Sequence, residues 1–338
     1  MRIINQEKLL YPNSICLNIS SSCKLRCKWC YKQAEISQNL NYRFFELFYN
    51  QIIKDRIQVL SLIGGEPTEH IEFFSFLKKI KNKYILLNTN GINFSKIEFL
   101  NQCLDKVDFK KNKNLFITLS IKGYDEKSFF EVTGNKCFDA LCDAIYNIQK
   151  RGVPRTYTYI YDRELNAEER LKFISFLDKY HISQLVISDL RPYKKRGKKN
   201  FFPESEENLD ELIYQLIGRG VDAYVRLNLP LCEYSKQFVF WLIQKRRLFT
   251  SCAVKRRQGF FFSSELDLIA CNQFGDYSLG KFGTDFSNYE ELCEYWNDDS
   301  IKNIFKKISG YPMEKCVTCN LWRICGGGCI LNWKMEVS

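Results

Sequence analysis

Three cysteines, Cys23, Cys27 and Cys30, lie within eight residues in the spacing C-x3-C-x2-C. Cysteine thiolates are the usual ligands of iron–sulfur clusters. Three of them bind three corners of a four-iron cube and leave the fourth iron open for a chelating substrate or cofactor. The spacing therefore predicts a site-differentiated [4Fe–4S] cluster. Two alternatives stay open at this point: three buried cysteines without a ligand, or part of a zinc site, which would need a fourth ligand.

A second cysteine group lies near the C-terminus. Cys316, Cys319, Cys325 and Cys329 follow the pattern C-x2-C-x5-C-x3-C, with three glycines, residues 326–328, before the last cysteine. Consecutive glycines let a backbone fold tightly around a ligand centre. The pattern predicts a second metal site, and by itself it fits a zinc knuckle as well as an iron–sulfur cluster.

Composition limits how these cysteines can be used. The chain has 15 cysteines but only two histidines, His70 and His181. Metal sites built from several imidazole ligands are therefore not expected, and thiolate ligands are the available kind. The N-terminal residues form no secretory signal, and no apolar run reaches the roughly 20 residues that span a bilayer. We therefore expect a cytoplasmic protein without membrane segments, in which cysteines serve metal or redox sites rather than disulfides.

The elements that must position the first cysteines form a regular pattern. Between residues 14 and 190, short β-rich runs alternate with amphipathic helical stretches, and the first cysteine group directly follows the first run. Six β–α alternations predict a parallel sheet with right-handed crossovers, either doubly wound or curled into a barrel. The expected strands are residues 14–20, 59–63, 84–88, 116–121, 156–161 and 184–190, and the expected helices include 41–55, 71–79, 138–151 and 167–180.

After about residue 200 the alternation stops. Residues 203–218 and 235–248 are expected to be helical, and a turn at Ser263, Ser264 and Glu265 predicts a β-hairpin of residues 259–262 and 266–270. The remainder is short, aromatic and rich in cysteine. The predicted domains are residues 1–230, with a connecting helix, and residues 231–338, which begin with a bridging helix.

Two motifs together resemble the signature of the radical S-adenosylmethionine (SAM) superfamily. Trp29 completes a C-x3-C-x-aromatic-C pattern, and Gly64, Gly65, Glu66 and Pro67 end the second expected strand as the family's G-G-E-P element does. The resemblance implies that the open iron binds the amino and carboxylate groups of SAM. It also implies that Glu66 and the neighbouring backbone hold the methionyl ammonium group, with the glycines allowing close approach.

Further matches to this family follow in chain order. Thr89 and Asn90 begin its T-N-G turn after the third strand, Ser120 ends the fourth strand where relatives contact the ribose, and Arg191 follows the sixth. One departure is Lys122, which stands where many relatives have an acid. The resemblance covers residues 14–192 and implies a partial (β/α)6, TIM-like barrel whose site lies at the carboxyl ends of the strands.

The C-terminal pattern resembles the SPASM domain, a small cysteine-rich domain with auxiliary [4Fe–4S] clusters. In that family two earlier cysteines flank a β-hairpin, as Cys252 and Cys271 flank the hairpin expected here. The resemblance implies one or two auxiliary clusters. It assigns Cys252, Cys271 and Cys329 to the first, and Cys316, Cys319 and Cys325 to the second.

The C-terminal region departs from the SPASM pattern in two places. Leu266 stands where the family has a glycine, and the family's final cysteine would lie well beyond Cys329, whereas this sequence ends at Ser338. The second auxiliary cluster therefore lacks an evident fourth ligand. Cys293, Cys232, a non-cysteine group and a longer chain are the alternatives.

The resemblance also implies the chemistry. A reduced cluster cleaves SAM to methionine and a 5′-deoxyadenosyl radical, and SPASM proteins mostly act on peptides or proteins. We expect a maturase that installs a thioether, a carbon–carbon crosslink or a related change in a ribosomally made peptide. The alternatives are a formylglycine-forming anaerobic sulfatase maturase, other radical SAM chemistry, or a structural zinc or RNA-binding protein. The sulfatase-type family has an Asp that serves as the catalytic base directly after the second early SPASM cysteine. Here that position, after Cys271, is Asn272, which is a poor base and disfavours the sulfatase-type reaction.

Partners follow from the same resemblance and from charge. Only 22 residues precede Cys23, so we expect no fused leader-binding domain; a separate leader-binding protein and direct electrostatic capture of the peptide are the alternatives. We also expect an electron donor such as flavodoxin or ferredoxin. The net charge is +11, and its densest basic run, residues 194–199, is expected at the barrel mouth, where it would attract an acidic leader peptide. No RNA-binding motif accompanies this charge, so a nucleic-acid partner is not expected.

The remaining candidates are single residues. Cys232, between the two predicted domains, is the one candidate for a catalytic hydrogen-atom donor. His70 is expected to cap a helix rather than approach the cofactor. Four further cysteines are expected to be small buried hydrophobes: Cys16, Cys103, Cys137 and Cys142.

Overall fold

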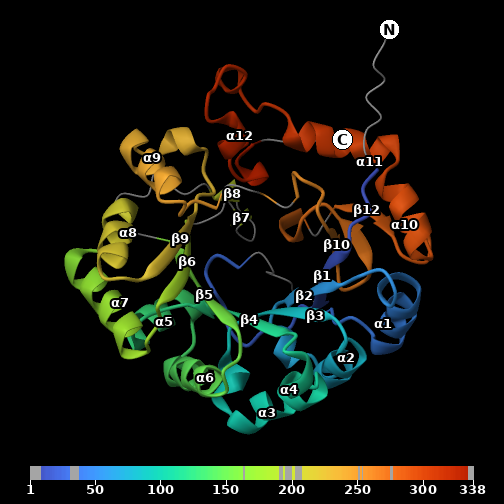
Figure 1. The fold of residues 1–338 in the computed structure, drawn as a ribbon, viewed down its shortest axis with the longest axis horizontal. Coiled ribbons are helices and arrows are strands. Elements are labelled where there is room, and N and C mark those ends of the chain that lie inside the picture. The colour runs from blue at the N-terminus through green and yellow to red at the C-terminus, as the bar shows by residue number, and fades with distance from the viewer. Residues whose placement is uncertain are drawn as a thin grey trace.

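A computed structural model gives the fold. It describes residues 9–30, 38–162, 164–189, 193–194, 200–201, 208–249, 252, 254–274 and 277–333. Helices surround a curved row of strands, and the C-terminal segment lies across the side that the barrel helices leave uncovered (Figure 1). No helix among these residues is both long and apolar enough to cross a membrane.

Six parallel strands form the centre of the sheet in sequence order. All six strands expected from the sequence are present, each within one residue of its expected ends. They are β1 (Ser14–Ser20), β2 (Val59–Gly64), β3 (Tyr84–Thr89), β4 (Leu115–Ile121), β5 (Arg155–Tyr161) and β6 (Gln184–Asp189).

Helices connect the parallel strands. Asn41, Asp125 and Asn166 cap the helices that follow them by accepting backbone N–H bonds, which supplies partners that the first turn of a helix lacks. The connecting helices are α1 (Tyr42–Phe48, continued by a π-helix at Tyr49–Ile53), α2 (Phe73–Lys79), α3 (Ile97–Lys106), α4 (Phe109–Asn112), α5 (Glu126–Thr133), α6 (Phe138–Lys150) and α7 (Ala167–Lys179).

The two faces of the sheet differ in polarity. In β4, Leu115, Ile117 and Leu119 are fully buried against the helices, whereas Thr118 and Ser120 alternate with them and are half-buried. The same alternation in the other parallel strands places hydroxyl and amide side chains on the face turned away from the helices, together with apolar ones such as Leu86 and Phe116. The interior of a closed TIM barrel is instead filled with bulky apolar side chains. The inner face of this barrel is therefore mixed, with polar groups among apolar side chains.

Strands outside the six βα units extend the sheet at both edges. The predicted hairpin is confirmed as β10 (Phe260–Phe262) and β11 (Asp267–Ile269), but β10 pairs in parallel with β1, so the hairpin continues the barrel sheet. β12 (Ser278–Lys281) follows β11, and β9 (Asp222–Arg226), which the sequence did not predict, pairs with β6. The two predicted domains therefore share one ten-stranded sheet.

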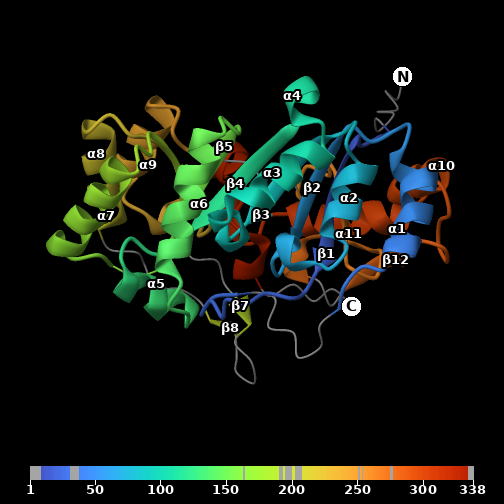
Figure 2. The ribbon, with the colours of Figure 1, turned by 90° about the horizontal axis from the view of Figure 1, so that it is seen from below.

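The remaining elements are short or lie in the C-terminal part. A two-stranded sheet of β7 (Tyr193–Lys194) and β8 (Asn200–Phe201) lies toward the same edge of the molecule as α5 (Figure 2). The other helices are α8 (Leu209–Gly218), α9 (Lys236–Gln244), α10 (Tyr289–Trp296), α11 (Asp299–Ser309) and α12 (Trp322–Cys325). Short 3₁₀ turns occur at Pro67–Glu69, Ile92–Ser95, Leu231–Glu233, Asn272–Phe274, Glu314–Cys316 and Ile330–Asn332.

Candidate active site

The first cysteine group lies on the loop that leaves the carboxyl end of β1. Cys23, Cys27 and Cys30 are each half-buried, while Leu25 between them is packed in the core. The backbone N–H of Cys30 donates to the carbonyl of Cys27 at 3.0 Å, which closes a turn. The loop is thus anchored by its apolar residue while its thiols stay accessible to a ligand.

Helix α5 holds this loop from one side. The backbone N–H groups of Arg26 and Lys28 donate to the carbonyls of Thr133 and Val132, at 2.8 and 3.0 Å. Carbonyls in the last turn of a helix have no partner within the helix, so they are available to a neighbouring loop. The Lys28 ammonium also forms an ion pair with Asp162, a nearly buried carboxylate directly after β5.

The glycine pair at the end of β2, Gly64 and Gly65, holds the start of the loop from the other side. The N–H groups of Gly65 and Glu66 donate to the carbonyls of Ser20 and Ser22, at 2.6 and 2.7 Å. A Cβ atom on Gly64 would lie 2.1 Å from the Ser20 oxygen, and one on Gly65 would lie 2.5 Å from the Ser22 oxygen. Only glycine therefore permits this approach of β2 to the backbone that leads into the cysteine loop.

Glu66 ties the turns after β2 and β3 together. Its side chain is buried, and Oε1 accepts bonds from the Thr68 N–H at 3.1 Å, the Thr68 hydroxyl at 2.6 Å and the Thr89 hydroxyl at 2.7 Å. Oε2 accepts from the Asn90 N–H at 2.6 Å. Burial raises the pKa of Glu66, while these donors act in the opposite direction. The predicted contact of Glu66 with the SAM ammonium group stays a prediction.

Asn90 brings the T-N-G turn to the cysteine loop. Its Nδ2 donates to Cys23 Sγ at 3.7 Å, and its Oδ1 accepts from the Ile92 N–H at 2.9 Å. The structure therefore joins one predicted cofactor-binding residue to one predicted cluster ligand. Burial, joined by the nearby carboxylates of Glu66 and Glu69, raises the pKa of the Cys23 thiol to about 12.

The other predicted cofactor residues lie around this loop or outside the described residues. Ser120 is half-buried at the carboxyl end of β4, and its Oγ accepts a weak bond from the Thr158 hydroxyl at 3.5 Å. Trp29 is half-buried beneath the Lys28 ammonium, and Pro67 is buried. Arg191 lies outside the described residues.

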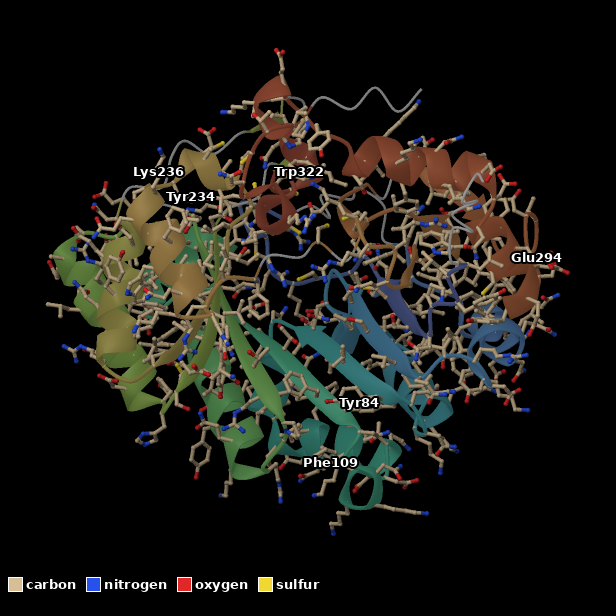
Figure 3. The ribbon with its side chains drawn as sticks, turned by 45° about the horizontal axis from the view of Figure 1, so that its top comes forward. Tyr84, Phe109, Tyr234, Lys236, Glu294 and Trp322 are labelled. Carbon is tan, nitrogen blue, oxygen red and sulfur yellow. The ribbon has the colours of Figure 1, made fainter. Side chains whose placement is uncertain are left out.

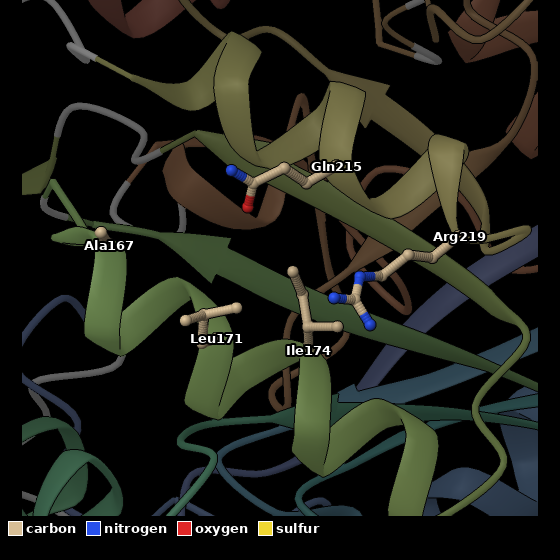
Figure 4. A pocket seen from close by; sticks show the side chains of 5 residues that line it. All are labelled: Ala167, Leu171, Ile174, Gln215 and Arg219. Carbon is tan, nitrogen blue, oxygen red and sulfur yellow. The ribbon is translucent and has the colours of Figure 1, made fainter.

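One hollow of the molecule lies away from these residues. It has a volume of 340 Å³ and lies on the outer layer between α7 and α8 (Figure 4). None of the predicted site residues lines it. Its lining side chains are Ala167, Leu171, Ile174, Gln215 and Arg219.

The C-terminal cysteines differ in exposure. Cys316 is buried, Cys319 is exposed, and Cys252, Cys271, Cys325 and Cys329 are half-buried. Among the residues that the structure describes, no three Cys, His, Asp or Glu side chains stand close enough to hold one metal ion. Two of the sulfurs accept backbone bonds, Cys325 from Leu231 at 3.3 Å and Cys271 from Gln273 at 3.5 Å.

Asn228 attaches the C-terminal cysteine segment to the barrel. Its carbonyl accepts bonds from the Cys329 N–H at 2.7 Å and from Asn332 Nδ2 at 2.6 Å. Gly328 adopts a φ of 71°, and a Cβ atom there would lie 2.6 Å from the Asn228 oxygen. The Asn228 N–H in turn donates to Asp189 at the end of β6, at 2.6 Å. The second cysteine group therefore lies at the carboxyl edge of the sheet.

Asp189 is a buried carboxyl group that sequence reasoning did not single out. It accepts bonds from the Tyr234 hydroxyl and from the N–H groups of Asn228 and Leu229. Burial raises its pKa to about 6 despite these donors. Figure 3 shows Tyr234 just before α9. An acidic residue at the last position of a buried strand was the available signal.

The single-residue predictions have mixed outcomes. Cys103 and Cys142 are buried, as expected, and Cys137 is half-buried. Cys16 instead lies half-buried on the inner face of the sheet, where Asn272 Nδ2 donates to its sulfur at 3.4 Å. His70 Nδ1 accepts from the Glu72 N–H at 2.9 Å, and its Nε2 bonds to the Leu40 carbonyl at 3.0 Å. The N-cap residue of α2 is Glu72, however, and no side chain among the described residues caps that helix, so the capping prediction is wrong. Cys232 is exposed between the barrel and the C-terminal segment, and its catalytic role stays a prediction.

Comparison with known sequences assigns part of the chain to a family. Residues 17–177, which contain all three cysteines of the first loop, match the radical SAM superfamily. The chain therefore contains a radical SAM domain. This family uses a [4Fe–4S] cluster and SAM. The curated proteins that match the chain are enzymes by name.

Curated relatives match only part of the chain. A GTP 3′,8-cyclase of Haemophilus influenzae is 24% identical over 51% of this chain and 58% of its own length, so the chain spans little more than half of that relative. A probable dual-specificity RNA methyltransferase RlmN of Carboxydothermus hydrogenoformans is 27% identical over 66% of this chain and 67% of its own.

Solved structures resemble the fold over nearly the whole chain. SuiB of Streptococcus suis bound to its precursor peptide SuiA has a TM-score of 0.67 at 20% identity, covering 96% of this chain and 73% of SuiB. The structure of anSMEcpe with bound AdoMet has a TM-score of 0.67 at 19% identity, covering 97% of this chain and 88% of that one. These matches establish the fold of the radical SAM protein described here.

Proposed function

We propose that this radical SAM enzyme modifies a ribosomally made peptide by forming a thioether, a carbon–carbon crosslink or a related bond. The observation that carries the proposal is the extent of the fold likeness. It extends beyond residues 17–177 and reaches 96% of the chain against SuiB, a protein that was solved with a precursor peptide bound. The curated nucleotide and RNA enzymes match only half to two thirds of the chain.

The cluster site in this proposal is the loop after β1. Cys23, Cys27 and Cys30 would hold three irons, and their accessible thiols on an anchored backbone fit that use. When loaded, this site supplies a 5′-deoxyadenosyl radical from SAM. Gly65 and Asn90 fix the loop against β2 and β3, so the chain itself sets the position at which the radical would form.

The polar groups on the mixed inner face would bind both SAM and the peptide substrate. Half-buried hydroxyl and amide groups, such as Ser61, Asn88 and Ser120, offer hydrogen bonds to the ribose of SAM and to a peptide backbone. The Asn88 amide donates to the Ser61 hydroxyl at 3.1 Å, so these groups are preoriented. A face lined by such groups suits a polar substrate.

The C-terminal cysteines would hold auxiliary clusters in a SPASM-like domain. Forming a crosslink removes two hydrogens from a peptide: one leaves as an atom to the deoxyadenosyl radical, and the other leaves as a proton and an electron. An auxiliary cluster is a suitable acceptor for that electron. The proposed ligand sets are Cys252, Cys271 and Cys329 for the first cluster and Cys316, Cys319 and Cys325 for the second.

A second candidate is modification of a nucleotide or RNA. The names of the curated relatives and the net charge of +11 favour it. Formylglycine formation is less favoured, because Asn272 occupies the position after Cys271 and its amide donates to Cys16 rather than serving as a base.

One experiment separates these candidates. Reduced, reconstituted enzyme is incubated with SAM and, in parallel, with short peptides encoded beside its gene, with GTP, or with RNA. The proposal predicts that one peptide raises 5′-deoxyadenosine above the substrate-free level and loses the mass of two hydrogens. If GTP or RNA raises 5′-deoxyadenosine formation, and every peptide neither raises it nor changes in mass, the second candidate would replace the peptide proposal.

A further inference from the structure

Lys255 places its ammonium group among the C-terminal cysteines. It follows Cys252 by three residues and is half-buried just before β10. Its Nζ donates to the carbonyl of Gly326 and, at 3.1 Å, to the carbonyl of Gly328. These two glycines lie directly after Cys325 and directly before Cys329. The ammonium group therefore holds the backbone of the segment that carries two predicted cluster ligands.

The glycine backbone is shaped for this contact. Gly326, Gly327 and Gly328 have φ values of 55°, 79° and 71°, a left-handed run that residues with a Cβ atom rarely adopt. This run presents two carbonyls to one donor, and a Cβ atom on Gly326 would come within 3.9 Å of Lys255 Nζ. The Lys255 carbonyl accepts from Ser309 at the end of α11, at 3.3 Å, which fixes the lysine backbone as well.

The sulfurs around Lys255 come from both predicted clusters. Burial lowers the pKa of Lys255, and the thiols of four cysteines oppose that shift electrostatically. Two of these thiols are assigned to the first auxiliary cluster and two to the second. They are Cys252 and Cys329, and Cys316 and Cys325, respectively.

We propose that Lys255 is a positioning residue shared by the two auxiliary clusters, fixing the glycine turn between their ligands and supplying the positive charge that offsets their thiolates. The proposal rests on the auxiliary clusters proposed above. A thiolate-bound cluster carries net negative charge that grows on reduction, and its potential depends on nearby charge and hydrogen bonding. A cation at this place makes the auxiliary clusters easier to reduce, which suits acceptors of a substrate electron.

The test compares three full-length variants in a Cys23/Cys27/Cys30→Ala background, in which only C-terminal clusters contribute signals. Lys255→Gln keeps a donor for the carbonyls without charge, Lys255→Arg keeps the charge, and Lys245→Gln changes an exposed lysine at the end of α9 as a control. The measurements are iron per chain and the midpoint potential of the cluster signals in electron paramagnetic resonance titrations.

The proposal predicts that Lys255→Gln lowers the midpoint potential or loses the iron of at least one cluster, that Lys255→Arg restores both in large part, and that Lys245→Gln changes neither. Iron and potential unchanged in Lys255→Gln, or equal losses in the Gln and Arg variants, would overturn the role of Lys255 and leave the clusters standing. A parent protein with zinc and no iron at the C-terminus would overturn the auxiliary clusters themselves, and with them the role of Lys255.

Discussion

The two cysteine groups of this protein are held in different ways. The first loop is fixed by backbone hydrogen bonds to α5 and to the glycine pair at the end of β2, and one of its two lysines, Lys28, pairs with Asp162. The C-terminal segment is fixed by the Asn228 carbonyl and by the Lys255 ammonium group, which bonds to carbonyls. The first site is thus a loop held by backbone bonds on two sides, and the second is a turn held around a cation.

The largest effect is expected where the first loop is held most tightly. Gly65→Ala places a methyl group 2.5 Å from the Ser22 carbonyl, and backbone cannot yield as a flexible side chain can. Forced overpacking of this kind costs about 1–3 kcal/mol, and here the strain falls on the cysteine loop. We expect loss of the N-terminal cluster with C-terminal iron retained, measured as iron per chain and 5′-deoxyadenosine formed.

Gly218→Ala is the matched control for this change. Gly218 ends α8 with no positive φ, and a Cβ atom there meets nothing within 4 Å. This variant should keep full iron content and cleavage. If the Gly65→Ala variant behaves like the Gly218→Ala variant in both measurements, the steric account of the first site is wrong.

Asp189 anchors the second region through Asn228. Its titration should make the free energy of unfolding depend on pH. Its pKa is raised to about 6 from an ordinary value near 3.8, so the folded state binds a proton more tightly than the unfolded state. Stability from this group is present at low pH and is lost as pH rises toward and through 6. In the parent, the free energy of unfolding should therefore fall between about pH 4 and 6 because of this group. The Asp189→Asn variant should lack about 1–3 kcal/mol of that fall.

Urea unfolding of the full-length chain at several pH values measures this effect. Asp299→Asn, at an exposed residue at the start of α11, serves as the control and should follow the parent. Parallel pH profiles for the parent and the Asp189→Asn variant would contradict the raised pKa.

Removing the acid beside the first loop should leave an unpaired positive charge near its cysteines, as Lys255 provides in the second cysteine group. Asp162→Asn leaves the Lys28 charge unpaired next to Cys27 and Cys30. Less negative charge nearby favours reduction, so the N-terminal cluster's potential should rise by on the order of 50 mV, about tenfold in its reduction equilibrium. Redox titration of both cluster types measures the shift, and equal shifts at both ends of the chain would contradict a local effect.

The smallest effect concerns the basic run at residues 194–199. Residues 195–199 lie outside the described residues, and the side chain of Lys194 is not described, so its place at the barrel mouth stays a prediction. Charge reversal at Lys195, Arg196 and Lys198 should weaken peptide binding severalfold at low salt and little at high salt, because a Debye length of about 8 Å at physiological ionic strength screens rim charges. An unchanged dissociation constant at low salt would show that this run does not capture substrate.

The sequence predicted the barrel well because its signals are local. Each parallel strand is a short apolar run between helices, so its ends were found within one residue. β9 was not predicted because it has only five residues. With Asp222 and Arg226 at its ends, it is too short to show the hydrophobic pattern of a strand. The pairing of β10 with β1 joins residues about 245 positions apart, and no local signal encodes such a contact.

The same contrast applies to the site. Cys23, Gly65 and Asn90 belong to short motifs, so their neighbourhood could be inferred from spacing. Asp189 and Lys255 act through bonds to loops distant in sequence, Asn228 and the glycines at 326–328, and only the folded chain brings those together. Motif residues were thus predictable, whereas the residues that hold the second cysteine group were not.

The central claim is that Cys23, Cys27 and Cys30 carry the cluster that cleaves SAM, and one comparison tests it directly. Parent protein and a Cys23/Cys27/Cys30→Ala variant are reconstituted without oxygen, reduced, and assayed for 5′-deoxyadenosine and iron. The account predicts that the parent forms 5′-deoxyadenosine from SAM, and that the variant forms none while retaining iron at its C-terminal cysteines. A variant that forms 5′-deoxyadenosine at the parent's rate would contradict it.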